Sequence, residues 1–181
     1  MNVLRNTRVD HYFEKYLRHL AGLPDLRFCQ IGVYMGDMTL WLLDNILTHE
    51  SCTLDDVDAR IEGYDGWTPE GVEAVYQERM EARDELYSQV GTHSLYSADF
   101  FAYITSAYRT EYDFIYVDAD HTSEGVLMDA CGAWQHLKSG GIIAFDDTDR
   151  EDTQRGVNAF LSAVDGYSLL ERGLQTWIQK S

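Results

Sequence analysis

Two side chains that could take part in catalysis follow a short apolar segment, residues 114–117. Asp118 comes directly after this segment, and His121 stands three positions later. An apolar run of this length is typical of a strand that is buried on both faces of a sheet. Imidazole titrates near neutral pH, so His121 is a candidate general base beside Asp118. A histidine that caps or packs against the start of a helix would give the same pattern.

A second apolar segment, residues 142–145, ends in the acidic pair Asp146 and Asp147. If the two segments are neighbouring strands, they lie about 5 Å apart and Asp118 converges with the pair. Three carboxylates that close repel one another unless one is protonated or a cation lies between them. Oxygen ligands of this kind suit Mg²⁺. The sequence therefore predicts a magnesium site, with the alternative that Asp146 and Asp147 only cap turns and point apart.

A glycine turn follows the first apolar segment of the chain, with Gln30, Gly32 and Gly36 at its fixed points. Gly32 would let the backbone turn tightly beneath a ligand, and Gly36 would open the next helix without a blocking side chain. The dinucleotide fingerprint is GxGxxG, whereas this turn is GxxxG. One glycine fewer favours a cofactor without a pyrophosphate, although a plain strand-to-helix connection also fits.

Two further acidic residues end predicted strands. Asp65 ends a strand predicted over residues 60–65, where a carboxylate could accept both hydroxyl protons of a ribose. Asp99 follows a strand predicted over residues 94–98, where it could meet an adenine amino group. Each of them could instead cap the element that follows, which for Asp99 is a helix beginning at Phe100.

Strands and helices alternate along the chain, which is typical of a parallel sheet with helices on both faces. Helical periodicity and capping residues predict helices over residues 12–20, 38–47, 69–90, 100–108, 123–137 and around 157–161. Strands are predicted over residues 28–33, 60–65, 94–98, 114–117, 142–145, 167–170 and 175–179. We therefore expect one α/β domain, residues 1–181, with an N-terminal helical segment (1–24) and a Rossmann-like, doubly wound, mostly parallel seven-stranded core (25–181). Ligands of such sheets bind beyond the carboxyl ends of the strands.

The composition favours a small-molecule partner. The net charge is −17, and the 14 basic residues are scattered, so the chain would repel nucleic-acid phosphates. Three cysteines without metal-binding spacing, no signal peptide and no long apolar stretch predict a cytoplasmic protein without a membrane segment.

Residues 28–148 resemble class I S-adenosylmethionine-dependent methyltransferases. The resemblance is closest to the small bacterial group that includes the macrocin-type sugar O-methyltransferases, methyltransferase family 24. Four motifs carry it: Gln30-Ile31-Gly32 with Gly36, Asp65-Gly66-Trp67, the strand ending Asp118 to His121, and Gly140 to Asp147.

The resemblance implies methylation of a small acceptor, at a hydroxyl oxygen, with Mg²⁺ held by Asp118, Asp146 and Asp147. It places Gly32 and Gly36 at the methionine part of S-adenosylmethionine, Asp65 at the ribose and Asp99 near the adenine. The residues expected to bind the cofactor are Gln30, Gly32, Tyr34, Gly36, Asp65, Gly66, Trp67, Asp99, Phe100, Asp118 and His121. Gln30 stands where the family has an acid, and an amide cannot attract the positive charges of the cofactor.

Other functions use the same residues. Asp118 and Asp120 also fit the metal-binding DxD of nucleotide-sugar glycosyltransferases, although the glycine turn would then have no role. The DxDxT motif of haloacid-dehalogenase-type phosphatases matches at this segment but belongs on a first strand. A non-catalytic cofactor-binding protein remains an alternative because of Gln30. Dimerisation through the N-terminal helix is a further open prediction.

Overall fold

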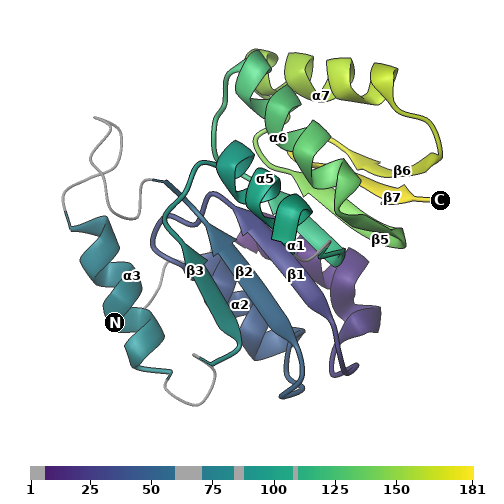
Figure 1. The fold of residues 1–181 in the computed structure, drawn as a ribbon. Coiled ribbons are helices and arrows are strands. Elements are labelled where there is room, and N and C mark those ends of the chain that lie inside the picture. Colours follow the sequence, from purple (N-terminus) through teal and green to yellow (C-terminus); the bar gives the residue numbers. More distant parts are fainter. Residues whose placement is uncertain (1–6, 60–70, 84–87, 108–109) are drawn as a thin grey trace.

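A seven-stranded sheet forms the centre of the molecule in the computed structural model, which describes residues 7–59, 71–83, 88–107 and 110–181 (Figure 1). The strand order is β3-β2-β1-β4-β5-β7-β6. The five strands from β3 to β5 run parallel, whereas β7 is antiparallel to both β5 and β6. The strands are β1 (Arg27–Ile31), β2 (Thr53–Val57), β3 (Val90–His93), β4 (Tyr112–Val117), β5 (Leu137–Phe145), β6 (Tyr167–Arg172) and β7 (Thr176–Lys180). The predicted fold class is confirmed.

Helices cover both faces of this sheet. The described helices are α1 (Thr7–Leu17) with the short 3₁₀ helix η1 (Arg18–Leu20), α2 (Asp37–Asn45), α3 (Val72–Glu81), α5 (Ser97–Ala107), α6 (Ser123–Gln135) and α7 (Glu151–Ala163). The helices α5, α6 and α7 pack on one face, and α1 and α2 on the other (Figure 1).

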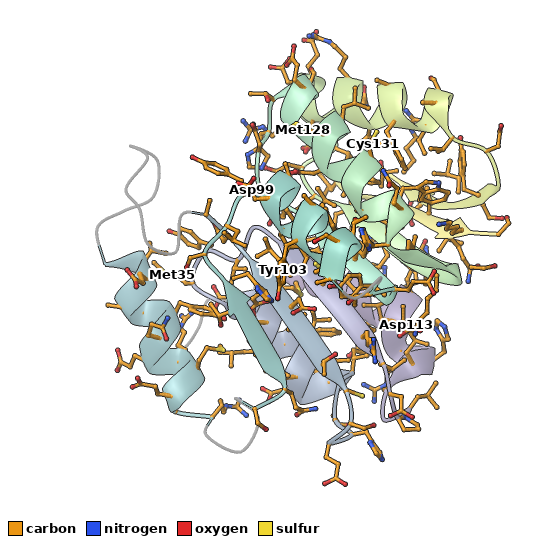
Figure 2. All side chains as sticks on the ribbon, in the orientation of Figure 1. Met35, Asp99, Tyr103, Asp113, Met128 and Cys131 are labelled. Carbon is orange, nitrogen blue, oxygen red and sulfur yellow. The ribbon has the colours of Figure 1, made fainter. Side chains whose placement is uncertain are left out.

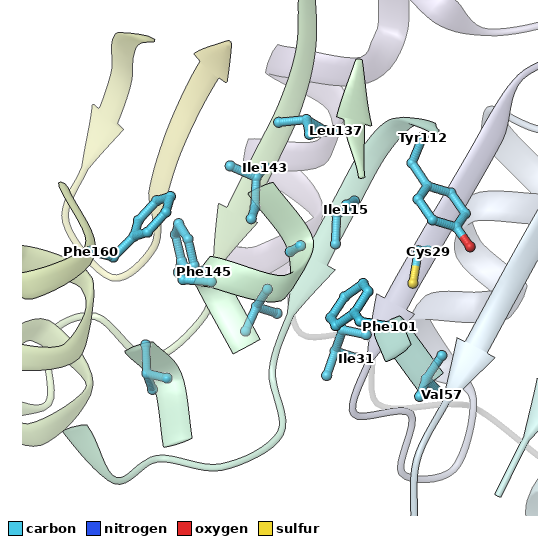
Figure 3. Close-up of a cluster of buried hydrophobic side chains, with 14 of the residues drawn as sticks. Cys29, Ile31, Val57, Phe101, Tyr112, Ile115, Leu137, Ile143, Phe145 and Phe160 are labelled. Carbon is cyan, nitrogen blue, oxygen red and sulfur yellow. The ribbon is translucent and has the colours of Figure 1, made fainter. Parts of the chain in front are cut away.

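The face under α5, α6 and α7 is filled by alternate residues of the central strands. Ile31, Ile115 and Ile143 come from three neighbouring strands and are almost completely buried. Phe101 of α5 and Phe160 of α7 pack down onto this layer (Figure 3). Strands that are apolar on both faces need such a cover on each side, so these helices follow from the sequence of β4 and β5.

The opposite face has an aromatic centre. Phe13 of α1 is fully buried and meets Phe114 and Trp177 edge to face, with ring centroids 5.9 and 5.0 Å apart. Leu17, one helical turn later, is also fully buried. The apolar side of α1 is therefore part of the protein's own core.

The second strand differs from the prediction. The structure forms β2 from Thr53–Val57, and the strand predicted over residues 60–65 lies outside the described residues. Asp55 and Asp56 lie inside β2 rather than in a turn. Each has hydroxyl or imidazole partners from neighbouring elements, and these contacts between distant parts of the chain offset the low strand propensity of aspartate.

The third strand also begins earlier than predicted. Val90 and Gly91 belong to β3 rather than to the end of the preceding helix, and α5 already begins at Ser97. Gly91 fits the strand because a Cβ there would lie 2.8 Å from the Asp55 carboxylate. The apolar periodicity of α3 continues by chance into β3, which is why the pattern overextends the helix.

The strand order reverses between β1 and β4, which are hydrogen-bonded neighbours. Gly32 follows β1 and Asp118 follows β4, so both lie at the carboxyl edge of this switch point. Ligands of doubly wound sheets bind in the crevice at such a point.

Candidate active site

Gly32 has a conformation and surroundings that exclude any side chain. Its φ is +86°, and a Cβ there would lie 2.0 Å from the carbonyl oxygen of Asp118. Its N–H donates to the carbonyl oxygen of Val57 at 2.9 Å, while the Asp118 N–H donates to that of Ile31 at 2.8 Å. Gly32 therefore lets the ends of β1, β2 and β4 come together at one place.

Gly36 has no room for a side chain at the start of α2. Its φ is +77°, and a Cβ would lie 2.8 Å from the ring of Tyr76. The missing side chain thus makes room for α3 at the start of α2. The role of Gly36 in binding the cofactor stays a prediction.

Gln30 is buried beneath the turn. Its Nε2 donates to the carbonyl oxygen of Gly32 at 2.9 Å, and its Oε1 accepts a long hydrogen bond of 3.5 Å from the Thr39 hydroxyl. An amide at this position therefore fixes the backbone of the turn. The carboxylate expected here from the family pattern could accept from Thr39 but could not donate to a carbonyl oxygen.

Asp58 is a candidate functional residue that the sequence reading missed. It directly follows β2, and its Oδ2 accepts from the backbone N–H groups of Val33 at 2.9 Å and Tyr34 at 3.3 Å. Asp65 was expected at this position, but Asp65, Gly66 and Trp67 lie outside the described residues. Correct placement of β2 at Thr53–Val57 would have pointed to Asp58.

Tyr34, Asp99 and Phe100 differ in exposure. Tyr34 lies in the turn with a φ of +52° and is 51% exposed. Asp99 is exposed in the first turn of α5, not at the end of a strand (Figure 2). Phe100 is fully buried and packs on His93, with ring centroids 4.8 Å apart. Only the backbone of Phe100 could contact a ligand.

His121 lies beside both Asp118 and Asp147. His121 Nε2 lies 3.7 Å from Asp118 Oδ1 and 3.3 Å from Asp147 Oδ2. This Nε2 atom is buried and makes no hydrogen bond. Arg150 lies on the far side of Asp147, with 3.4 Å between its Nη1 and Asp147 Oδ2. Carboxylates this close favour the protonated form of the imidazole, so His121 is a candidate for holding a proton at this edge.

Asp146 is held from the opposite side by the β7 end of the sheet. Its Oδ1 accepts from Gln175 Nε2 at 2.7 Å, and Gln175 Oε1 accepts from the indole N–H of Trp177 at 2.9 Å. The indole fixes which end of the Gln175 amide faces Asp146. Asp146 and Asp147 therefore have different partners.

The pKa values of the cluster are shifted by burial and by mutual charge. Burial raises the pKa of Asp118 to about 6, and Asp146 and Asp147 add to this shift. The neighbouring Asp118 carboxylate raises the pKa of His121. Burial also raises the pKa of Asp146, although the Gln175 hydrogen bond opposes that shift. A positive charge bound among these groups would relieve their repulsion.

Two observations bear on the predicted magnesium site. Across the described ranges, no group of three or more histidine, cysteine, aspartate or glutamate side chains is arranged to hold a metal ion. His121, rather than an ion, offsets the charge between Asp118 and Asp147. The metal ligands Asp118, Asp146 and Asp147 stay a prediction.

Asp120 does not form a DxD metal pair with Asp118. Its Oδ1 accepts from the backbone N–H of Thr122 at 2.8 Å, and its carboxylate packs against Gly125 of α6. Thr122 in turn caps α6 through the N–H of Gly125. Asp120 therefore shapes the start of α6, which speaks against the glycosyltransferase alternative.

Comparison with known families decides between the remaining classes. The model of a methyltransferase domain, family 24, matches residues 29–148. The chain belongs to this methyltransferase family. The match covers the glycine turn, Asp118, His121 and the Asp146–Asp147 pair, so the resemblance predicted from these motifs is confirmed, as is a methyltransferase enzyme. No curated protein matches the sequence of this methyltransferase.

Solved structures share the fold at low sequence identity. CalS11, a TDP-rhamnose 3′-O-methyltransferase of calicheamicin biosynthesis, is 16% identical, with a TM-score of 0.69 over 97% of this chain and 80% of its own. An O-methyltransferase from Bacillus cereus in complex with SAH is 18% identical, with a TM-score of 0.66 over 85% of this chain and 74% of its own.

A larger methyltransferase has the same fold in about half of its length. MycE of the mycinamycin pathway, in complex with Mg, SAH and mycinamycin VI, is 13% identical, with a TM-score of 0.64 over 94% of this chain and 48% of its own. Among the described helices of the present methyltransferase, none has the length and apolar character needed to cross a bilayer.

Proposed function

We propose that this methyltransferase transfers the methyl group of S-adenosylmethionine to a hydroxyl oxygen of a small molecule. The observation that carries the proposal is the meeting of Gly32 with Asp118 and His121 at the switch point of the sheet. Family membership gives methyl transfer, and the switch point is where a doubly wound sheet binds its cofactor.

The turn and its neighbours fit the proposed cofactor. The close approach of Gly32 to the Asp118 backbone brings the ends of β1 and β4 together at the carboxyl edge, and Asp58 ends β2 at the same edge. A carboxylate there can accept hydrogen bonds from a ribose diol in exchange for the Val33 and Tyr34 amides that it now binds. The SAH bound to the Bacillus cereus enzyme and to MycE supports this choice of cofactor.

His121 is proposed to remove the acceptor proton. Methyl transfer is an in-line displacement at a sulfonium carbon, so the protein mainly aligns the acceptor oxygen and takes up its proton. Asp118 raises the pKa of the His121 imidazole, which favours uptake of a proton from a hydroxyl group. Asp118 and Asp147 stabilise the imidazolium that results, because their carboxylates lie on either side of it.

A divalent metal would polarise the acceptor hydroxyl, and Asp118, Asp146 and Asp147 are the residues that would hold it. MycE contains Mg in its complex. If the proposed metal site exists, EDTA should abolish activity and Asp146→Asn should do the same while SAH affinity stays unchanged. Full activity in EDTA would remove the metal from the proposal.

The acceptor is proposed to be a hydroxylated small molecule, such as a sugar or a sugar-bearing metabolite. CalS11 acts on a TDP-sugar, and MycE was crystallised with mycinamycin VI. The net charge of −17 disfavours a nucleic-acid acceptor. The proposed cellular place is the cytoplasm, where the free cysteines Cys29, Cys52 and Cys131 stay reduced.

The proposal can be tested with methyl-labelled S-adenosylmethionine. We expect label to pass to at least one member of a panel of hydroxylated metabolites, nucleotide sugars and glycosides, and His121→Gln to stop the transfer. Label that passes only to an RNA oligonucleotide or to a protein would contradict the proposed acceptor class. Binding of UDP-sugars with Mn²⁺, without any response to SAH, would favour a glycosyltransferase instead.

A further inference from the structure

Asp56 is a fully buried carboxylate in the middle of β2. Its register partner on β1 is Gln30, so the two side chains lie side by side on the sheet face that α2 and α3 cover. Asp56 Oδ2 accepts from the hydroxyl groups of Thr39 and Tyr76, both at 2.8 Å. Asp56 Oδ1 is buried without a hydrogen-bond partner.

The partners of Asp56 connect it to both ends of the glycine turn. Thr39 lies in the first turn of α2, just after Gly36, and also contacts Gln30, which donates to the Gly32 carbonyl oxygen. The Tyr76 ring packs where Gly36 has no side chain. The carboxylate therefore lies directly beneath the turn.

Within the described part of the chain, Asp56 forms no ion pair with a basic side chain. The nearby cation Arg79 instead binds the carbonyl oxygen of Met35 and pairs with Asp37. Asp55, the adjacent carboxylate, points to the other face and pairs with His93 and Tyr112. A buried carboxylate without a cation destabilises the fold while it is ionised, and a positive charge bound nearby would offset this cost.

We propose that Asp56 supplies the negative charge under the cofactor turn and makes the site prefer the methylated, cationic cofactor to the demethylated product. This inference rests on the proposed function. S-adenosylmethionine carries a positive sulfonium, whereas the sulfur of SAH is neutral, and the two ligands are otherwise alike. A carboxylate beneath the turn attracts the first and leaves the second unaffected, which favours product release. The negative charge that Gln30 lacks is thus found on the neighbouring strand.

The protonation state of Asp56 is expected to respond to the ligand. Burial raises the pKa of Asp56 to about 7, whereas the hydrogen bonds from Thr39 and Tyr76 oppose this shift. A bound cation favours the ionised form, so the preference for S-adenosylmethionine should grow as the pH rises through 7. The other titratable groups that interact with Asp56 are Asp55, Asp58, Tyr76 and Cys29.

The test is the ratio of the dissociation constants of SAH and S-adenosylmethionine, measured by calorimetry at pH 8. We expect Asp56→Asn to reduce this ratio roughly tenfold, because one charge–charge attraction is lost, and to leave the affinity for SAH unchanged. Asp55→Asn is the matched control, since it removes the adjacent carboxylate on the opposite face and should keep the wild-type ratio. An unchanged ratio in Asp56→Asn, or an equal loss of both ligands, would overturn the inference. A wild-type protein that binds neither ligand would instead refute the proposed function.

Tyr76→Phe gives a second test if Asp56→Asn does not fold. This change removes one hydroxyl that stabilises the ionised carboxylate, so the pKa of Asp56 should rise further. The ratio should then fall at pH 7 and recover at pH 9, which a packing defect would not produce. A ratio that stays low at every pH, or that does not change at all, would contradict the role given to Asp56.

Discussion

Individual side chains at the switch point have clearly different surroundings. His121 Nε2 is buried between two carboxylates and makes no hydrogen bond, whereas Asp146 is fixed by Gln175. Asp120 is bound within its own turn. The carboxylate beside His121 raises the pKa of its imidazole and so favours proton uptake, whereas Asp120 and Asp146 accept hydrogen bonds from other protein groups. His121 is therefore the side chain whose loss should affect chemistry most.

Replacement of His121 by glutamine should reduce kcat about 10²- to 10⁴-fold, because the amide cannot accept the proton of the acceptor hydroxyl. The affinity for SAH should change little. Steady-state kinetics and calorimetry measure the two effects separately. His49→Gln is the control, since His49 is exposed and its side chain contacts only Ser51. Wild-type kcat in His121→Gln would remove the histidine from the mechanism.

Gly32 can be tested against a glycine of similar conformation. Gly32 and Gly140 have φ values of +86° and +80°, but only at Gly32 would a Cβ meet backbone, since nothing lies within 4 Å at Gly140. Gly140→Ala should therefore cost about 1 kcal/mol of unfolding free energy from its left-handed backbone. Gly32→Ala should cost about 3 kcal/mol or more and abolish SAH binding, because the strand ends must separate. Urea unfolding measures the loss of unfolding free energy in each variant. An equal loss in the two variants would contradict the close approach of Gly32 and Asp118.

Among the strands, β2 is one whose position could not be predicted from local sequence. The apolar segments of β1, β4 and β5 were predicted as strands, but β5 begins at Leu137, within the stretch that was assigned to the end of a helix. By contrast, β2 contains Asp55 and Asp56, whose partners Tyr76, His93 and Tyr112 come from elements up to 57 positions away. No local pattern contains those contacts. The same limit hid Asp58, while the cluster of Asp118, His121 and Asp147 could be predicted because parallel strand ends share one edge.

The buried charge of β2 predicts an unusual dependence of stability on pH. Burial raises the pKa of Asp56 from 3.8 to about 7, so the unfolded chain loses this proton at lower pH than the folded protein. The Asp56 contribution to the free energy of unfolding should therefore fall as the pH rises from about 4 to 7.

Asp56→Asn should remove this pH dependence and stabilise the unliganded protein at pH 8. Urea unfolding at a series of pH values measures the effect, with Asp55→Asn as the comparison. If the unfolding free energy of the wild-type protein changed with pH at the same slope as that of Asp56→Asn, the result would contradict a raised pKa of Asp56.

The whole molecule combines a methyltransferase fold with a strongly negative net charge. Residues 29–148 match the methyltransferase domain, and the remainder adds α1, α7 and the antiparallel β6 and β7. These additions complete the site, because Trp177 packs on Phe13 of α1 and orients Gln175 toward Asp146. The net charge of −17 suits a cationic cofactor and disfavours polyanions. Fold and charge together agree with a methyltransferase for small molecules.

The central claim is that the turn at Gly32 binds S-adenosylmethionine. Calorimetric titration of the wild-type protein with SAH, which cannot be turned over, tests it most directly. We predict saturable binding to one site per chain and loss of that binding in Gly32→Ala, with Gly140→Ala unaffected. No heat of binding and no rise in melting temperature at millimolar SAH or S-adenosylmethionine would contradict the account.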